Sequence, residues 1–221
     1  MLDEKSKGAV KMIISHSHKF IFIKTRKTAG SAIEIALSKF LGPNDIITSS
    51  PLEGIEARNC PDELKNRYGF YDGHQGQDYI RKEFPNEWRN YYKFTSERHP
   101  VDKVLSGYRW SMVLNDKYRA IGIDVKKPTP NSLSEFLNSG RTPCDWTKYA
   151  KNDVVLVDTV IEHKKINDGY RHVCNEIGLP QNSLPEAVKK TSADVFELSA
   201  NDLNVIRHSF SKEIEHFNYE I

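Results

Sequence analysis

The sequence from Phe20 to Leu41, FIFIKTRKTAGSAIEIALSKFL, decides the fold expected of this chain. Its first four residues, Phe20–Ile23, are all apolar, which is typical of a short strand buried on both faces of a sheet. From Ser31 onward the apolar residues recur with the period of a helix. They are Ile33, Ala36, Leu37, Phe40 and Leu41. Gly42 and Pro43 end this helix, so the pattern predicts a strand that leads directly into a helix.

A polar turn, KTRKTAG at residues 24–30, joins the strand to the helix. It carries three cations, Lys24, Arg26 and Lys27, and no carboxylate. The first N–H groups of a helix have no partner within the helix, and the helix dipole is positive at that end. Such a turn predicts an anion site, most naturally for a phosphate. An ordinary basic turn between a strand and a helix is the alternative interpretation.

A second strand, turn and helix follow further along the chain. Tyr92–Ser96 alternates and is rich in aromatic residues, as expected of a strand, and Pro100 suits the first position of a helix. The apolar stripe of this helix is Val101, Val104, Leu105 and Tyr108, and its opposite face holds Asp102, Lys103, Ser106 and Arg109. Arg98 lies in the turn and Ser106 about two helical turns further on. A guanidinium in such a turn can bind a phosphate through a planar, charge-assisted fork.

The composition indicates a globular protein of one domain, residues 1–221, with 38% hydrophobic and 28% charged residues. A net charge of +2 gives no argument for binding to nucleic acid or membrane. The three cysteines are widely spaced, which fits a reducing cytoplasm better than a disulfide framework or a zinc site. We find neither a membrane-spanning apolar run nor a signal peptide in the sequence, so we expect a cytoplasmic protein, bacterial or viral in origin.

The two turns together resemble the nucleotide motifs of sulfotransferases that use 3′-phosphoadenosine-5′-phosphosulfate (PAPS). Lys27–Ser31, KTAGS, is similar to the 5′-phosphosulfate loop of that family, and Arg98–Tyr108 is similar to its 3′-phosphate motif. The resemblance implies an α/β, P-loop-NTPase-like fold of three layers, with a central parallel sheet flanked by helices. It also implies that PAPS donates a sulfuryl group to an acceptor hydroxyl, and that adenosine 3′,5′-bisphosphate (PAP) is released without the need for a metal.

The same resemblance assigns roles to individual residues. Lys27 is expected to be catalytic, because it would neutralise the oxygen on which charge builds up as the nucleotide leaves. The nucleotide-binding residues that the resemblance implies are Arg26, Lys27, Thr28, Ala29, Gly30, Ser31, Ala32, Arg98, Ser106, Lys189 and Lys190. Arg26 and Ala32 depart from the family pattern, which commonly has a proline and a hydroxyl residue there. Lys189 and Lys190 would belong to a basic lid, or else they are a solvated lysine pair.

His74 is the expected base. It follows Gly73 in a glycine-rich turn between the two motifs, so a loop displays it. Carbohydrate 2-O-sulfotransferases carry a similar Gly-His in a comparable place, and imidazole titrates near neutral pH. By this resemblance His74 would accept the proton of the acceptor hydroxyl. A surface or hydrogen-bonded histidine is the alternative.

Periodicity predicts several further elements. These are a helix over Asp78–Phe84 continuing after Pro85, a buried strand at Val154–Val157 extended by Asp158–Glu162, a helix over Ile166–Ile177, and a capped helix from Ser199 to Phe217. Residues 1–11 are expected to be a loose leader. Residues 111–150, which include a short capped helix at Asn131–Leu137, are expected to lie on the acceptor side.

Two other functions stay open at this point. One is a nucleotide or small-molecule kinase that uses ATP and magnesium, against which the absence of a GxxxxGK motif argues. The other is a non-catalytic nucleotide-binding module. The loop histidine favours the hydroxyl of a carbohydrate or small metabolite as acceptor, and the sequence indicates no particular oligomeric state.

Overall fold

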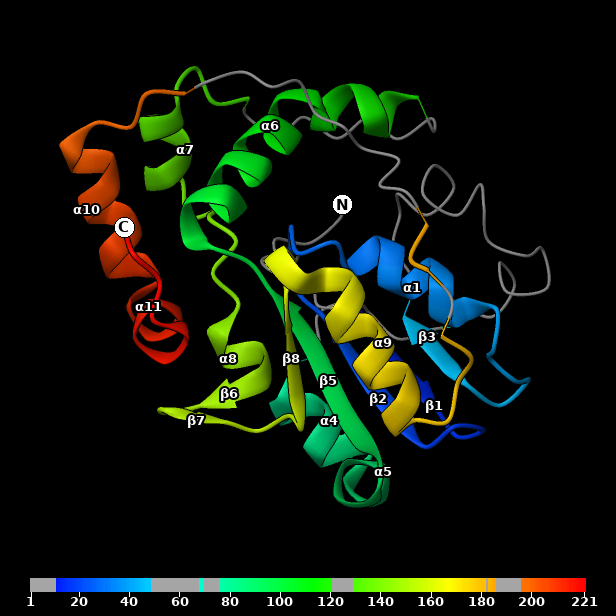
Figure 1. The fold of residues 1–221 in the computed structure, drawn as a ribbon. Helices are drawn as coiled ribbons and strands as arrows, with labels where there is room; N and C mark the ends of the chain where they lie inside the picture. The colour runs from blue at the N-terminus through cyan, green and yellow to red at the C-terminus, as the bar shows by residue number, and fades with distance from the viewer. Residues whose placement is uncertain (1–10, 49–67, 70–75, 121–128, 182, 186–195) are drawn as a thin grey trace.

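The computed structural model describes residues 11–48, 68–69, 76–120, 129–181, 183–185 and 196–221. They form an α/β fold in which one six-stranded sheet of order β4-β3-β1-β2-β5-β8 lies between helices (Figure 1). The strands are β1 (Lys11–Ser15), β2 (Phe20–Lys24), β3 (Ile46–Thr48), β4 (Tyr68–Gly69), β5 (Tyr92–Glu97) and β8 (Thr159–Glu162). The predicted α/β class, with a helix-flanked central sheet, is confirmed.

The sheet is mixed, and the prediction of a parallel sheet was therefore wrong. Strands β2, β5 and β8 are parallel neighbours, but β1 is antiparallel to both β2 and β3. The strand at Phe20 is therefore the second of a hairpin, and Lys11, which was assigned to a leader, already belongs to β1. Three apolar residues are too few to reveal a period, yet Met12 and Ile14 face one core cluster and Ile13 the other.

Two helices cover one face of the sheet, α1 (Gly30–Ser38) and α9 (Ile166–Glu176). Phe22 of β2 stacks on Phe94 of β5 with ring centroids 5.1 Å apart. Leu37 of α1 and Val173 of α9 join the same buried cluster. These helices begin and end within a few residues of the predicted bounds, because their apolar stripes are long enough to show a helical period.

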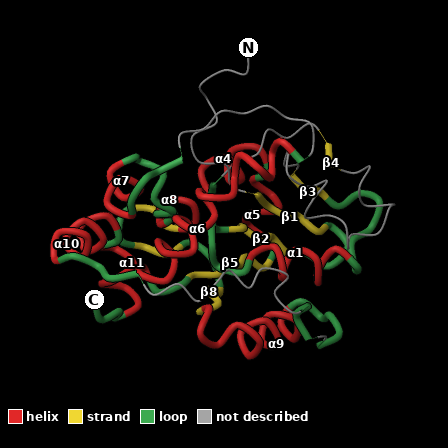
Figure 2. Tube along the Cα trace, turned by 90° about the horizontal axis from the view of Figure 1, so that it is seen from above, coloured by secondary structure: helices red, strands yellow, loops and turns green. Residues whose placement is uncertain are grey.

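Three short helices lie on the other face: α4 (Gln77–Glu83), α5 (Pro85–Asn90) and α8 (Trp146–Tyr149). Ile21 and Ile23 of β2 pack there against Ile80 of α4 and Tyr149 of α8. Figure 2 shows α9 on one side of the strands and α4 and α5 on the other. The strands are thus buried from both sides, as the apolar run at Phe20–Ile23 predicted.

A third helical cluster contains α6 (Pro100–Arg119), α7 (Leu133–Asn138), α10 (Ala200–Ser209) and α11 (Ser211–Phe217). The predicted capping box at the start of α10 is confirmed, with Ser199 and Asp202 bonding each other's backbone N–H. The prediction of a single C-terminal helix was wrong. The chain turns at the buried Phe210, and a second helix, α11, follows. Helix α6 is longer than its apolar stripe indicated.

The prediction of a buried strand at Val154–Val157 was also wrong. Val154–Val155 forms β7, which pairs with β6 (Ala150–Lys151) in a separate two-stranded sheet, and Val154 is 61% exposed. The strand that joins the main sheet is β8, which lies within the predicted extension Asp158–Glu162. A continuous apolar run indicated burial here but did not show which residues would pair with β5.

Candidate functional site

Both predicted anion sites lie at one edge of the sheet. Strands β2 and β5 are parallel neighbours, with Ile23 opposite Thr95, so the loops that follow them leave the sheet at the same edge. The first loop, residues 25–29, follows β2 and leads into α1, and the second loop, residues 98–99, follows β5 and leads into α6 (Figure 1). The carboxyl ends of parallel strands are where open α/β sheets bind ligands.

Buried hydroxyl groups fasten the first loop to β5. The hydroxyl of Thr25 donates to the backbone carbonyl oxygen of Ser96, and the Thr28 hydroxyl lies 2.9 Å from both the Thr25 hydroxyl and the Ser96 hydroxyl. None of the three residues is more than 2% exposed. Because Ser96 stands two residues before Arg98, these bonds fix the first loop close to the start of the second.

The backbone of the first loop holds an uncommon conformation. Lys27 and Ala29 have φ angles of 63° and 66°, in the left-handed region that non-glycine residues seldom adopt. Such strain costs on the order of 1–3 kcal/mol per residue and clusters at ligand sites. Ala29 caps α1 without a side-chain bond, and its carbonyl oxygen accepts from the N–H groups of Ala32 and Ile33. The N-terminus of α1 therefore lies at the edge of the sheet where the two loops are, and its N–H groups can bind an anion there.

Position 30 requires glycine because the Lys24 side chain lies close to its Cα, and not because of its backbone angles. A Cβ atom at this position would lie 2.6 Å from Cγ of Lys24, in the middle of that side chain. Lys24 cannot easily move aside, because its ammonium group pairs with the carboxylate of Glu34 in α1. The glycine of the KTAGS motif thus lets the helix start directly over β2.

Lys27 reaches from the first loop to helix α6. Its Nζ lies 4.9 Å from the ring centroid of Trp110, a cation–π contact. Trp110 follows Ser106 by four residues, so the two side chains share one face of α6. The structure therefore brings the predicted catalytic lysine to the helix face that carries the predicted phosphate-binding serine. Trp110 was not assigned to the site from the sequence, although its spacing from Ser106 could have indicated it.

Arg98 stands in the second loop in a setting that disfavours its charge. Its Nε is buried and has no hydrogen-bond partner among the described residues; the nearest carboxylate, Asp102, lies 3.8 Å away. Burial lowers the pKa of Arg98, and Arg109 lowers it further, while Asp102 opposes both. Burial and then Arg98 also lower the pKa of His163, which follows β8. An anionic ligand would relieve this concentration of positive charge.

Arg26 is engaged with a buried carboxylate. Its backbone N–H and its Nε donate to the two oxygens of Asp145, at 2.6 and 2.8 Å, and an Nη donates to the Cys144 carbonyl oxygen at 2.9 Å. Asp145 is fully buried at the start of α8. Asp145 could not be predicted from the sequence, because no local pattern marks an isolated aspartate as the partner of a residue more than a hundred positions away.

Asp145 belongs to a cluster of buried charges under the first loop. Its carboxylate lies 3.7 Å from Nζ of Lys103 and 2.7 Å from Nζ of Lys148. Lys103, which was expected on the polar face of α6, is fully buried and pairs with Glu97 at 2.6 Å. Burial would raise the pKa of Asp145, but Lys103, Lys148 and Arg26 outweigh it and hold the pKa below its ordinary value.

Three predicted site residues, His74, Lys189 and Lys190, lie outside the described residues. Their roles as base and lid stay predictions. Within the described ranges, no group of three or more His, Cys, Asp or Glu residues is arranged to hold a metal ion. No helix in the described part of the chain is both long and apolar enough to span a membrane.

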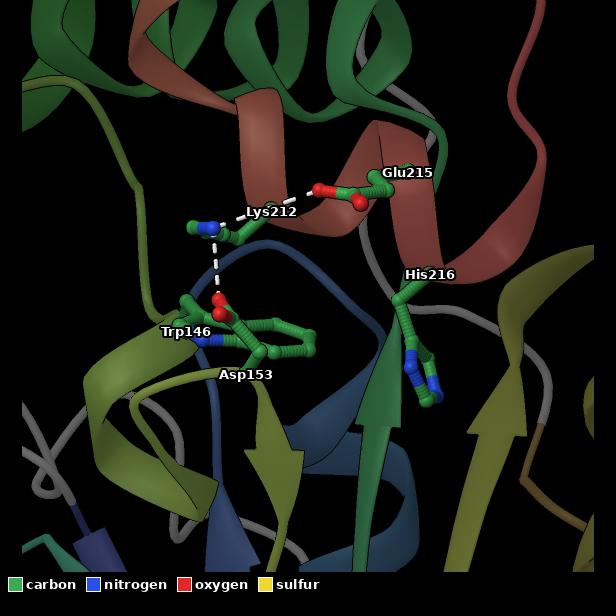
Figure 3. A pocket seen from close by; sticks show the side chains of 5 residues that line it. All are labelled: Trp146, Asp153, Lys212, Glu215 and His216. Carbon is green, nitrogen blue, oxygen red and sulfur yellow. Dashed lines mark ion pairs between the residues drawn. The ribbon is translucent and has the colours of Figure 1, made fainter.

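A separate hollow of about 110 Å³ lies where α8, the β6–β7 hairpin and α11 meet (Figure 3). It is lined by Trp146, Asp153, Lys212, Glu215 and His216. The ammonium group of Lys212 pairs with the carboxylates of Asp153 and Glu215 across it. None of its lining residues belongs to the two motifs.

Comparison with known proteins gives a family for the chain. A model of the sulfotransferase family matches residues 10–220. Among solved structures, a sulfotransferase from Alicyclobacillus acidocaldarius matches 92% of this chain and 96% of its own, with 14% sequence identity and a TM-score of 0.36. No curated protein gives a significant match.

Proposed function

The protein belongs to the sulfotransferase family, and from that premise we propose that it transfers the sulfuryl group of PAPS to the hydroxyl of a carbohydrate or small metabolite. One observation carries the proposal. The first and second loops leave neighbouring parallel strands at one edge and are joined there by Thr25, Thr28 and Ser96. A nucleotide with phosphates on both sides of its ribose needs two anion sites held at a fixed separation.

The first loop suits the 5′ end of the nucleotide. The start of α1 at Gly30 gives backbone N–H groups and the positive end of a helix dipole, which favour a phosphate. Lys27 adds a cation on a loop whose strained backbone fixes its position. In the proposed reaction Lys27 stabilises the negative charge that develops on the leaving oxygen, which is where electrostatic catalysis contributes most.

The second loop and α6 suit the 3′-phosphate. Arg98 offers a planar guanidinium with a buried N–H that lacks a partner in the described part of the chain, and a phosphate dianion would supply one. Ser106 adds a hydroxyl on the α6 face that Lys27 reaches. Both ends of the ligand would then meet positive charge that the chain already holds in place.

Sulfuryl transfer requires in-line attack by the acceptor oxygen on sulfur. The new bond forms between that oxygen and sulfur, and the bond from sulfur to the 5′-phosphate oxygen breaks, so PAP leaves with the electron pair. The acceptor proton goes to a base, for which we propose His74. Positioning and charge stabilisation supply most of the rate enhancement in the analogous phosphoryl transfer. We further propose that Lys189 and Lys190 cover the nucleotide and that the protein acts in the cytoplasm.

Titration calorimetry with PAP and with ATP–Mg²⁺ tests the nucleotide assignment. We expect PAP to bind and ATP–Mg²⁺ to bind far more weakly, since the loop lacks the glycines of a triphosphate-binding loop. Incubation with sulfur-labelled PAPS and a panel of sugars and small alcohols then tests transfer. Preference for ATP–Mg²⁺ would favour a kinase, and PAP binding without transfer to any acceptor would favour a non-catalytic module.

A further inference from the structure

Asp145 contacts the structural supports of both anion sites. On one side its two oxygens accept hydrogen bonds from the backbone N–H and Nε of Arg26, the residue before Lys27. On the other side it lies 3.7 Å from Nζ of Lys103, one turn before Ser106 on α6. One buried carboxylate therefore lies between the first loop and the helix that carries the second anion site.

The second loop is tied to the same cluster through Glu97. One oxygen of Glu97 accepts from Nζ of Lys103 at 2.6 Å and from the backbone N–H of Arg98 at 2.8 Å, and the other accepts from the Tyr149 hydroxyl at 3.0 Å. Lys103 thus bridges Glu97 at the end of β5 to Asp145 at the start of α8. The path from Arg26 to Arg98 runs through Asp145, Lys103 and Glu97, which are all fully buried.

Stability alone is a poor explanation for such a cluster. Buried ion pairs are costly to desolvate, and well-packed apolar residues of similar volume are often as stable or more stable. What a cluster of buried hydrogen bonds and ion pairs does supply is a defined geometry, because each donor and acceptor permits few arrangements. This geometry is what two anion sites need if they are to hold one rigid ligand.

We propose that Asp145 is a positioning residue that sets the separation of the two anion sites, so that PAP is bound by both at once. The inference rests on the proposed function. When two linked groups of one ligand bind a pre-set pair of sites, the second contact is intramolecular and strengthens binding strongly; it is lost if the geometry forbids simultaneous engagement. A change at Asp145 should therefore weaken binding of the bisphosphate far more than binding of either monophosphate.

The test compares three ligands, PAP, adenosine 5′-monophosphate and adenosine 3′-monophosphate, on the full chain. In the parent protein PAP should bind much more tightly than either monophosphate. In Asp145→Asn, which keeps the size of the side chain and removes its charge, we expect this preference to fall on the order of 10²-fold, because linked contacts strengthen binding by about 10²–10⁴ only while both can form together. Affinities for the two monophosphates should change by much less. A purely structural role would lower the melting temperature but leave the preference intact.

Lys148→Met is the matched control, because Lys148 pairs with the same carboxylate at 2.7 Å but is not part of the path from Arg26 to Arg98. The preference should survive in this variant. If Asp145→Asn does not fold, Arg26→Gln removes the side-chain half of the loop connection and leaves the backbone N–H bond to Asp145, so it should reduce the preference to a smaller extent; this side chain is 30% exposed.

The outcomes separate the two proposals. A parent protein that binds PAP no more tightly than the monophosphates would overturn the proposed function itself. A parent that prefers PAP, with a folded Asp145→Asn or Arg26→Gln variant that prefers it equally, would overturn only the positioning role. A preference reduced equally by Lys148→Met would also overturn it, because general loosening of the cluster would then explain the result.

Discussion

The ammonium group of Lys27 lies 4.9 Å from the ring centroid of Trp110, so the loop after β2 touches the helix after β5. A cation over an exposed indole contributes about 0.5–1 kcal/mol, and about 2 kcal/mol when desolvated. A hydrogen bond between charged groups is stronger than this. The contact is therefore strong enough to orient Lys27 against α6 and weak enough to be exchanged for a sulfated ligand.

Lys27→Ala should abolish sulfuryl transfer and weaken PAP binding. Loss of one preorganised charge stabiliser costs about 10²–10³ in rate, and this lysine would serve both the leaving oxygen and the 5′-phosphate. The measurement is transfer of labelled sulfate from PAPS, with calorimetry for PAP. Lys82→Ala, at a side chain that is 82% exposed, is the control and should behave as the parent. Turnover of the Lys27 variant near the parent rate would count against its catalytic role.

PAP binding should change tryptophan fluorescence through Trp110. If Lys27 leaves the indole to meet the nucleotide, the charge next to the ring changes, and so should its emission. The change should be absent in Trp110→Phe and retained in Trp88→Phe, where Lys93 lies 5.9 Å from the ring centroid. A signal that persists undiminished without Trp110 would show that the change does not come from this indole and would contradict the prediction.

Gly30→Ala should destabilise the protein and weaken PAP binding. In a helix this change usually adds about 0.5–1 kcal/mol of stability. Here the new methyl group would lie 2.6 Å from Cγ of Lys24, and overpacking of this kind costs about 1–3 kcal/mol. Urea unfolding and calorimetry measure the two effects. Adding Lys24→Ala should restore part of the PAP affinity, and a single variant as stable as the parent would contradict the steric argument.

His74→Ala should slow transfer by roughly 10²–10⁴-fold if His74 is the general base. PAP affinity should stay near that of the parent, because the base would act on the acceptor and not on the nucleotide. The rate should also lose its dependence on a group that titrates near neutral pH. His172→Ala, in α9, is a control at a histidine outside the two motifs. A rate within a few-fold of the parent would remove His74 from this role.

The two strand-turn-helix units could be predicted because their signals are local. A run of apolar residues stops, a polar turn follows, and a helical period starts within a few positions, at Ser31 and again at Pro100. The hairpin partner β1 could not be predicted in this way, because Met12–Ile14 is too short to show a period. Strand β8 lies within the predicted extension Asp158–Glu162, but the stronger apolar signal stood at Val154–Val157, because an edge strand tolerates polar residues such as Thr159 and Glu162.

The buried charges could not be predicted from sequence for a different reason. Charged residues are almost never fully buried unless they are paired, so Lys103 is expected on the polar face of α6. Its burial depends on Glu97 and Asp145, and Asp145 comes close to it only through the tertiary fold. The residues predicted to contact the ligand therefore follow from local sequence patterns, whereas the residues that hold the loops in place depend on the tertiary fold.

Breaking this cluster should give a pH-dependent loss of stability. The pKa of Asp145 is lowered in the folded state. Its charge therefore stabilises the fold fully above the unfolded pKa of about 3.9, and this stabilisation is lost as the pH falls through the lower folded pKa. Burial acts to lower the pKa of Lys103, but Glu97 and Asp145 raise it overall. The charge of Lys103 therefore stabilises the fold fully below the unfolded pKa of about 10.4, and this stabilisation is lost as the pH rises through the higher folded pKa.

Asp145→Asn should therefore lower the free energy of unfolding in urea by about 3–5 kcal/mol at pH 7, the usual cost of breaking a buried pair. The difference from the parent should shrink as the pH falls below about 4, because the parent then loses the same charge. Asp116→Asn, at an exposed pair with Arg119, should change stability by no more than about 1 kcal/mol at any pH. A difference between parent and Asp145→Asn that stays constant from pH 7 into strong acid would mean that the carboxylate charge does not stabilise the fold.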